Sequence, residues 1–269
     1  MSGFAYRNGV LHAEDVPLTE IAGSYGTPAY VYSRAAIETA WQAFHQPLQG
    51  CRHLLCYAVK ANSNLAILAL LARLGSGFDI VSGGELQRVL RAGGDPNRIV
   101  FSGVGKSEAD IRAALAAGIL CFNVESAAEL ERINRIALAG GLQAPVSLRV
   151  NPDVDARTHP YISTGLRDNK FGIDIVEAEA LYRSHASHPG IRFIGADFHI
   201  GSQLLDIEPI LDALDRVLAL VDRLAEAGLS LHHIDVGGGI GVRYRDEQRP
   251  DTAEYVAAVR NRIGDRPLT

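Results

Sequence analysis

Residues 54–81, LLCYAVKANSNLAILALLARLGSGFDIV, contain one complete strand, helix and second strand. Leu54–Val59 and Phe78–Val81 are apolar runs of strand length. Between them, Leu65–Leu74 repeats apolar residues every three and four positions, as one buried helical stripe requires. Strand, helix and strand in this order predict parallel strands joined by a right-handed crossover, and therefore an α/β fold.

The same alternation continues along the chain. Further strands are predicted at Ile99–Ser102, Leu120–Val124, Val146–Val150, Phe193–His199 and His233–Val236. Helices are predicted at Gly84–Ala92, Ser107–Ala117, Ser126–Ala139, Ile175–His185, Ile207–Ala227 and Asp251–Ile263. Such alternation is typical of a barrel or of an open, doubly wound sheet, and the pattern alone leaves both open.

Ionisable side chains favour the barrel. They lie at or just beyond the carboxyl ends of four predicted strands: Lys60, Asp79, Arg149 and His199. In a (β/α)₈ barrel this rim forms the active site. An eighth strand is expected after the helix Asp251–Ile263, where the chain ends at Thr269. We therefore expect a TIM-type (β/α)₈ barrel that is incomplete at its C-terminal end.

The first 50 residues do not follow the alternation. Phe4–Val10 and Ala29–Tyr32 have strand character without a crossover partner, and Ser33–Phe44 is a predicted helix capped by Ser33. We expect two domains: residues 1–50, whose strands and helix pair with another part of the protein, and residues 51–269, the barrel.

Composition restricts the classes of function. The chain has 269 residues, 47% hydrophobic and 21% charged, which is typical of a packed globular protein and not of a disordered one. Its net charge is −5 and its basic residues are scattered, which argues against binding to nucleic acid or to an anionic membrane.

Cysteine usage and the N-terminus indicate the compartment. Cys51, Cys56 and Cys121 are an odd number without C-x-x-C spacing, as expected of reduced thiols. The N-terminus has no apolar signal segment, and the longest apolar run, Leu65–Ala72, is far short of the roughly 20 residues of a membrane span. The histidines show no metal-ligand spacing. We expect a soluble, cytoplasmic protein without a metal.

Lys60 is the strongest single candidate for chemistry. It ends a predicted buried strand, and alternation places it on one face with Cys56 and Ala58. A desolvated amine has a lowered pKa and can attack a carbonyl, forming a Schiff base with an aldehyde substrate or pyridoxal phosphate. The alternative is a lysine whose ammonium extends from the strand end into solvent.

Two loops are candidates for binding an anion or a flat cofactor. Gly237, Gly238 and Gly239 follow the seventh predicted strand, and consecutive glycines let backbone N–H groups approach a phosphate. Otherwise they form an ordinary turn. After the sixth strand, His199 could stack on a cofactor or move protons and Ser202 could bind phosphate oxygens, whereas a lone histidine is more often structural.

Three further charged residues are candidates for the site, and two of them have a second interpretation. Asp79 and Glu85 flank the start of a helix, where Glu85 could line a site or simply interact favourably with the helix N-terminus. Arg149 ends the fifth predicted strand, where it could contact a cofactor or carboxylate, or form an ion pair.

Four strings in this order resemble the fold-type III pyridoxal-phosphate decarboxylases of the ornithine and diaminopimelate group: Tyr57–Asn62 (YAVKAN), Phe78–Glu85 (FDIVSGGE), His199–Gln203 (HIGSQ) and Gly237–Gly239. Within that group, Thr158–Gly165 followed by Lys170–Gly172, in a long loop, is similar to the diaminopimelate decarboxylases. The resemblance covers nearly the whole chain. It implies a barrel of the alanine racemase and ornithine decarboxylase type.

The resemblance also implies a cofactor, roles and a reaction. Lys60 would bind pyridoxal 5′-phosphate covalently and His199 would stack on its ring, these two being the catalytic residues. The phosphate would be held by Ser202 and the glycines, Gly239 foremost, and the site would be lined by Asp79, Glu85 and Arg149. The substrate would be the small amino acid meso-2,6-diaminopimelate, and the products L-lysine, as in lysine biosynthesis, and carbon dioxide. The full-length protein would be a homodimer.

The sequence departs from the family in one respect. The Glu-Pro-Gly-Arg motif of strand eight and the C-terminal β-domain, which the N-terminal strands join in the family, have no counterpart before Thr269. We therefore expect low activity of this chain alone. Two other functions stay open: a decarboxylase of ornithine, arginine or carboxynorspermidine, and a non-catalytic partner of a decarboxylase, against which the retained Lys60 argues.

Overall fold

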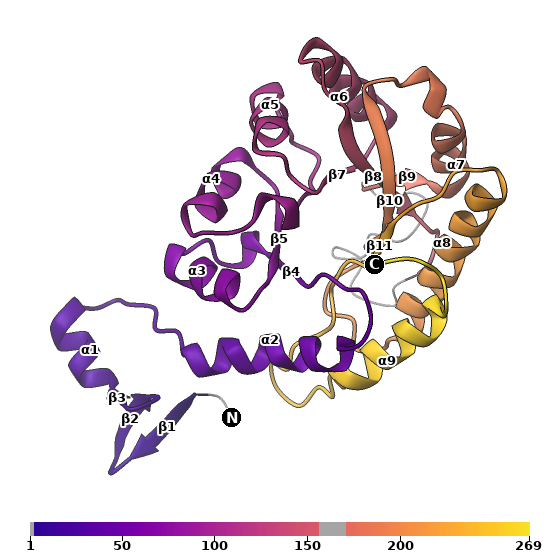
Figure 1. Ribbon diagram of the computed structural model, residues 1–269. Coiled ribbons are helices and arrows are strands. Elements are labelled where there is room, and N and C mark those ends of the chain that lie inside the picture. The colour runs from indigo at the N-terminus through magenta and orange to yellow at the C-terminus, as the bar shows by residue number, and fades with distance from the viewer. Residues whose placement is uncertain (1–2, 156–170) are drawn as a thin grey trace. The chain divides into compact units, whose positions relative to one another are not determined.

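The computed structural model describes residues 3–155 and 171–269 and divides the chain into two compact units (Figure 1). The N-terminal unit is Met1–Gln49 and the larger unit is Gly50–Thr269. The Thr158–Gly165 string and Lys170 lie outside the described residues.

The N-terminal unit is a small antiparallel sheet followed by two helices. Its elements are β1 (Phe4–Arg7), β2 (Val10–Ala13), β3 (Val16–Pro17), α1 (Leu18–Tyr25) and α2 (Arg34–Leu48). Ser33 caps α2 as predicted, because its Oγ accepts the Ala36 N–H at 3.0 Å. Glu14, after β2, accepts a hydrogen bond from the Ser33 hydroxyl at 2.7 Å and so ties the sheet to α2.

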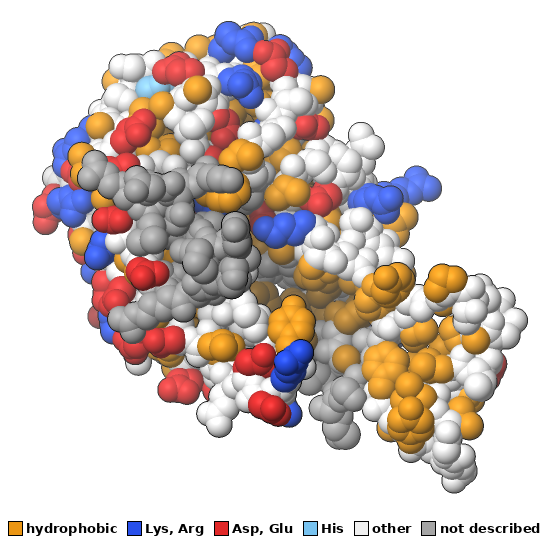
Figure 2. Space-filling view, turned by 180° about the vertical axis from the view of Figure 1, so that it is seen from behind, with side chains coloured by type: hydrophobic (Ala, Val, Ile, Leu, Met, Phe, Trp, Pro, Cys, Tyr) orange, Lys and Arg blue, Asp and Glu red, His pale blue; other side chains and the backbone are white. Residues whose placement is uncertain are grey.

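Two predictions in this unit were wrong. The stretch Phe4–Val10 is a hairpin and not one strand, because Asn8 and Gly9 both have positive φ and form the turn that an Asn-Gly pair favours. Ala29–Tyr32 is not a strand, because β-forming residues need a neighbouring strand and this segment has none among the described residues. Figure 2 shows hydrophobic side chains gathered on the surface of this unit, where Tyr25 and Tyr30 are 84% and 92% exposed.

The larger unit is built on a curved parallel sheet. Its seven strands in the described part of the chain lie side by side in sequence order, and every pair is parallel. They are β4 (Cys56–Ala58), β5 (Gly77–Ile80), β6 (Ile99–Phe101), β7 (Cys121–Val124), β8 (Ala144–Asn151), β10 (Ile191–Asp197) and β11 (His233–Asp235), with the short β9 (Ile173–Asp174) beside β8.

A helix follows nearly every strand, and Figure 1 shows these helices on the outer face of the sheet. They are α3 (Leu65–Arg73), α4 (Gly83–Arg91), α5 (Glu108–Ala117), α6 (Ala127–Ala139), α7 (Ile175–Arg183), α8 (Glu208–Glu226) and α9 (Thr252–Ile263). Several begin where the sequence offers a cap: the hydroxyls of Ser82, Ser107 and Ser126 each accept a backbone N–H from the first turn that follows.

Strand order resolves the choice between the two architectures. A doubly wound sheet reverses its strand order at a switch point and has helices on both faces. The described strands of this sheet instead follow one another in sequence order, and their helices lie on the outer face. It is an incomplete TIM-type barrel, as predicted. At the outer edge of β11, the Thr269 N–H donates to the His232 carbonyl, and the Thr269 carbonyl accepts the Ile234 N–H. A residue of a parallel neighbouring strand makes the same pair of hydrogen bonds.

The core lies between this sheet and its helices. Phe101 of β6 and Phe122 of β7 are fully buried and stack with ring centroids 6.0 Å apart. Within the described residues, no helix is long and apolar enough to cross a membrane, and no group of three or more His, Cys, Asp or Glu side chains could hold a metal ion. Cys51, Cys56 and Cys121 are not joined to one another by disulfide bonds.

Candidate active site

The carboxyl ends of the parallel strands bring the predicted residues to one edge of the sheet. Asp79 lies on β5 and Arg149 on β8, while His199 follows β10 and the glycine run follows β11. Lys60 follows β4 directly, in a 3₁₀ turn at Val59–Ala61. Because the strands are parallel, these positions share the edge at which barrel enzymes build their sites.

The structure corrects the burial predicted for Lys60. Its side chain is exposed, because β4 ends at Ala58 and the lysine lies beyond the strand, in the turn. The ammonium nevertheless acts on the edge of the sheet: its positive charge lowers the pKa of both Asp79 and His199. Lys60 is therefore an accessible amine within electrostatic reach of two predicted site residues.

Asp79 is a carboxyl group with an elevated pKa. Burial is the main cause, and together with the negative charges of Asp235 and Glu85 it raises the pKa from 3.8 to about 6. A hydrogen bond from Ser102 and the charge of Lys60 oppose this shift. The Asp79 Oδ1 atom is buried and has no hydrogen-bond partner among the described residues. A buried acceptor without a donor is costly, and such an atom calls for an explanation such as a role in binding.

His199 is neutral at physiological pH. Burial lowers its pKa from 6.5 to about 4, with further contributions from the positive charges of Arg149 and Lys60. Its Nδ1 atom accepts the Gly238 N–H at 3.4 Å, so the neutral ring carries its proton on Nε2. A flat, neutral ring held in this way can stack on a planar group or transfer a proton at Nε2.

Two positions of the glycine run, Gly237 and Gly239, admit no other residue. Gly237 and Gly239 have φ of +64° and +100°. A Cβ atom on Gly237 would lie 2.5 Å from the Phe198 carbonyl oxygen, and one on Gly239 would lie 2.0 Å from that of Gly201. The glycines therefore let the loop after β11 approach the loop after β10 backbone to backbone.

Hydrogen bonds hold these two loops together. Leu204 donates its N–H to the Gly239 carbonyl, and Gly241 donates back to the Leu204 carbonyl, both at 2.8 Å. Ser202 is exposed and lies in the first of these loops, three residues after His199. The two loops thus form a cradle of backbone with a hydroxyl at its rim, suited to an anion.

Glu85 and Arg149 make the structural contacts that the sequence left open as alternatives to a role in the site. For Glu85 this was a contact at the start of a helix, and for Arg149 an ion pair. Glu85 Oε2 accepts the Val81 N–H at 2.7 Å, just before α4, and the charge of Glu85 still contributes to the raised pKa of Asp79. Arg149 donates from Nη1 to Glu125 Oε1 at 3.0 Å and lies 5.2 Å from the centroid of the Phe171 ring. Neither contact removes these residues from the edge of the sheet.

Sequence reasoning missed two acidic residues at this edge, the buried Asp197 and the half-buried Asp235. Burial and the Asp235 charge raise the pKa of Asp197 well above its ordinary value. Asp235 itself accepts the Gly237 N–H at 2.8 Å and a hydrogen bond from Asn123 Nδ2 at 3.3 Å. Alternation would have found Asp197, which lies two residues before His199 at the end of β10 and therefore on the same face.

Comparisons with known proteins identify the family of this chain. Residues 34–267 match the sequence model of the family described as pyridoxal-dependent decarboxylase, pyridoxal binding domain. The chain is 61% identical to diaminopimelate decarboxylase of Pseudomonas aeruginosa over 269 residues, all of this chain and 65% of the relative, and 58% identical to that of Vibrio cholerae, with 98% and 63% covered. This chain thus spans about two thirds of the length of these relatives.

A solved structure shares the fold of this chain. Diaminopimelate decarboxylase from Helicobacter pylori, complexed with L-lysine, superimposes with a TM-score of 0.90 at 46% identity, over 94% of this chain and 64% of that one. The buried Asp79 oxygen, the glycine cradle and the nearby amine of Lys60 fit a phosphorylated pyridoxal cofactor. With the family model covering most of the chain, this protein belongs to the pyridoxal-dependent decarboxylases and contains their pyridoxal-binding domain.

Proposed function

We propose that the protein decarboxylates meso-2,6-diaminopimelate to L-lysine and carbon dioxide, using pyridoxal 5′-phosphate at the carboxyl edge of the sheet. The observation that carries the proposal is the grouping of an accessible amine, a buried acid, a neutral imidazole and a glycine cradle at this edge. The names of the relatives supply the choice of substrate over ornithine, arginine or carboxynorspermidine.

Each residue has a role that follows from its surroundings. Lys60 would hold the cofactor through its amine, and the face of His199 would orient the ring. Gly237, Gly238 and Gly239, with Ser202, would hold the phosphate. When bound, pyridoxal phosphate supplies a sink for the electron pair left behind as the carboxylate departs.

The acidic residues and Arg149 would tune charge and protonation. With a pKa of about 6, the Asp79 carboxylate can accept and return a proton close to neutral pH, within reach of the Lys60 charge. Glu85 keeps the turn before α4 in place and adds its charge to the surroundings of Asp79. The Arg149 guanidinium places positive charge near His199 and favours the neutral ring.

We further propose that residues 1–50 join a β-domain in the longer protein, that two copies associate, and that the protein acts in the cytoplasm. The exposed tyrosines of the N-terminal unit and its division from the rest at Gln49 support the first part. Sedimentation of the longer protein tests the dimer, and a monomer at micromolar concentration would contradict it.

The cofactor assignment is tested by retention of pyridoxal phosphate. The chain should acquire the visible absorbance of the bound cofactor, and Lys60→Ala should abolish it. Arg52→Ala is the matched control, because Arg52 is another exposed cation that lies shortly before β4, and its removal should leave the absorbance unchanged. Absorbance that persists in Lys60→Ala contradicts the assignment.

The reaction is tested with a panel of amino acids. Protein loaded with the cofactor should form lysine from meso-diaminopimelate, measured by mass spectrometry, and the Lys60→Ala protein should not. Faster turnover of ornithine or arginine than of meso-diaminopimelate contradicts the proposed substrate.

A further inference from the structure

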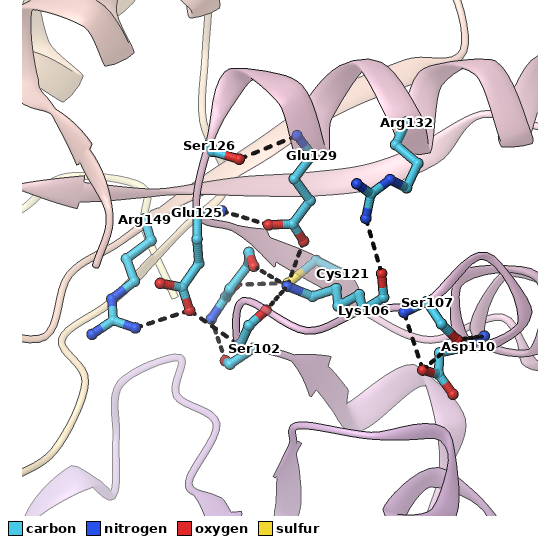
Figure 3. A network of polar contacts seen from close by, with 12 residues as sticks. Ser102, Lys106, Ser107, Asp110, Cys121, Glu125, Ser126, Glu129, Arg132 and Arg149 are labelled. Carbon is cyan, nitrogen blue, oxygen red and sulfur yellow. Dashed lines mark hydrogen bonds and ion pairs between the residues drawn. The ribbon is translucent and has the colours of Figure 1, made fainter. Parts of the chain in front are cut away.

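Lys106 is a buried cation that does not belong to the cofactor site. It lies in the loop between β6 and α5, and its side chain is 0% exposed. Its Nζ atom donates to the Gly103 carbonyl at 2.7 Å, to the Asn123 carbonyl at 2.8 Å and to Glu129 Oε1 at 2.6 Å (Figure 3). All three ammonium protons are therefore matched to acceptors, as burial of a charge requires.

Glu129 connects this lysine to a second buried acid. It lies in the first turn of α6, and its Oε2 atom accepts the Glu125 N–H at 3.0 Å. The side chain of Glu125 then accepts the Gly103 N–H at 3.1 Å and a hydrogen bond from Arg149 Nη1 at 3.0 Å, both at Oε1. Gly103 is thus bound on both sides, its carbonyl by Lys106 and its N–H by Glu125.

The series ends at the edge of the sheet. Glu125 is 2% exposed at its side chain and Arg149 13%, so the pair is shielded from water and keeps its strength. Figure 3 shows Lys106, Glu129, Glu125 and Arg149 in sequence. Arg149, at the end of this series, is paired in register with Asp197 of the neighbouring strand β10, two residues before His199. Its charge acts on the His199 ring.

A buried ion pair adds little to the free energy of unfolding, because the cost of desolvating the two charges offsets most of their attraction. Its best-attested role is to fix the positions of the groups around it. We propose that Lys106 and Glu129 are positioning residues: they hold Glu125 in place, and Glu125 holds the Arg149 guanidinium near His199. The catalytic relevance of this arrangement rests on the proposed function, but the arrangement itself does not.

The consequence falls on the protonation of His199. Among the described residues, three groups act on its ring: Arg149 from β8, Lys60 from the turn after β4, and the Gly238 N–H from the loop after β11. If Glu125 is no longer fixed, the guanidinium moves toward solvent and its repulsion of the imidazolium weakens. The pKa of His199 then rises toward the ordinary value of a histidine.

The test is an NMR titration of His199 in the chain without cofactor, with the resonance assigned by its loss in His199→Gln. Lys106→Met and Glu129→Gln should each raise the pKa of His199, by about one unit. The matched control is Asn134→Ala, because Asn134 is a buried polar residue of the same helix whose Oδ1 accepts the Gly190 N–H at 2.9 Å, away from this series. It should lower thermal stability without moving the His199 pKa.

The variants distinguish a positioning role of Lys106 and Glu129 from a purely structural one. Should Lys106→Met not fold, Glu129→Gln keeps the shape of the side chain and carries the test. A His199 pKa unchanged in the folded variants, with a loss of stability like that of Asn134→Ala, overturns the positioning role and leaves a structural one. Failure of the proposed function would appear separately, as wild-type chain that retains no pyridoxal phosphate.

Discussion

Replacing Gly239 by alanine should destabilise the fold and weaken the cradle. The structure separates the loss of stability into two parts, backbone strain and a steric clash. At φ +100° a side chain strains the backbone, which costs about 1–2 kcal/mol. The new Cβ would also lie 2.0 Å from the Gly201 carbonyl oxygen, which belongs to the backbone and cannot rotate away. Forcing atoms into such a packed position costs about 1–3 kcal/mol more.

Two other glycines serve as matched controls. Gly228, after α8, has φ +84° with nothing within 4 Å of the position that a Cβ would take, so alanine there brings the strain without the clash. Gly238 has neither a positive φ nor a close neighbour, so alanine there should be neutral or stabilise by up to about 1 kcal/mol. We expect losses of about 2–5 kcal/mol for Gly239→Ala and about 1–2 kcal/mol for Gly228→Ala.

The assay is urea unfolding followed by circular dichroism, because the single tryptophan, Trp41, lies in the N-terminal unit and reports on that unit. Pyridoxal phosphate affinity should fall about tenfold or more in Gly239→Ala, equivalent to about 1.4 kcal/mol or more, and should be unchanged in Gly228→Ala. If Gly239→Ala loses no more stability than Gly228→Ala, the close approach of the two loops is refuted as the reason for this glycine.

Three further predictions concern groups inside the larger unit. From pH 4 to 6, the folded protein keeps a proton on Asp79 (pKa about 6, against 3.8) that the unfolded chain has lost, whereas His199 (pKa about 4, against 6.5) does the reverse. Compared with the wild type, stability should therefore rise more steeply with pH in Asp79→Asn and fall more steeply in His199→Gln, by up to about 3 kcal/mol each in denaturant melts; the same slope in both variants would contradict the two shifts. Burial raises the pKa of the Cys121 thiol, so iodoacetamide should label Cys51 first, and equal labelling in native protein would contradict the fold. Tyr182→Phe should cost about 1–3 kcal/mol in a urea melt, because its buried hydroxyl bridges backbone groups of β8 and β10, and a loss below about 0.5 kcal/mol would contradict that bridge.

Local periodicity was sufficient to predict the strands and helices of the larger unit. Each predicted strand contains or overlaps an observed one, because short apolar runs between amphipathic helices have no other way to bury both faces. The error at Phe4–Val10 was also local: the Asn8-Gly9 pair is a hairpin signal in the sequence itself. Ala29–Tyr32 failed for the opposite reason, since a strand depends on a neighbour that local sequence does not specify.

The site could be predicted in part. The sequence predicted that Lys60, Asp79, His199 and the glycines share one edge of the sheet, and the structure places them there, because this depends only on strand order. Lys106 could not be found in this way. It pairs with a glutamate 23 positions along the chain, and a lysine in a polar loop shows nothing in the sequence to indicate that it is buried.

The N-termini of three helices and the strands of the sheet differ in how well their polar groups are satisfied. The serine caps of α4, α5 and α6 are hydrogen-bonded, so folding meets the needs of these helices within the chain. The buried oxygens Asp79 Oδ1, Glu125 Oε2 and Ser147 Oγ have no hydrogen-bond partner in the described part of the chain. Each lies on or just after a strand of the sheet, and each costs stability. Natural proteins keep such a cost mainly at functional sites, where binding recovers it. These three oxygens therefore mark positions at which a bound group, or the water that it displaces, is expected to donate a hydrogen bond.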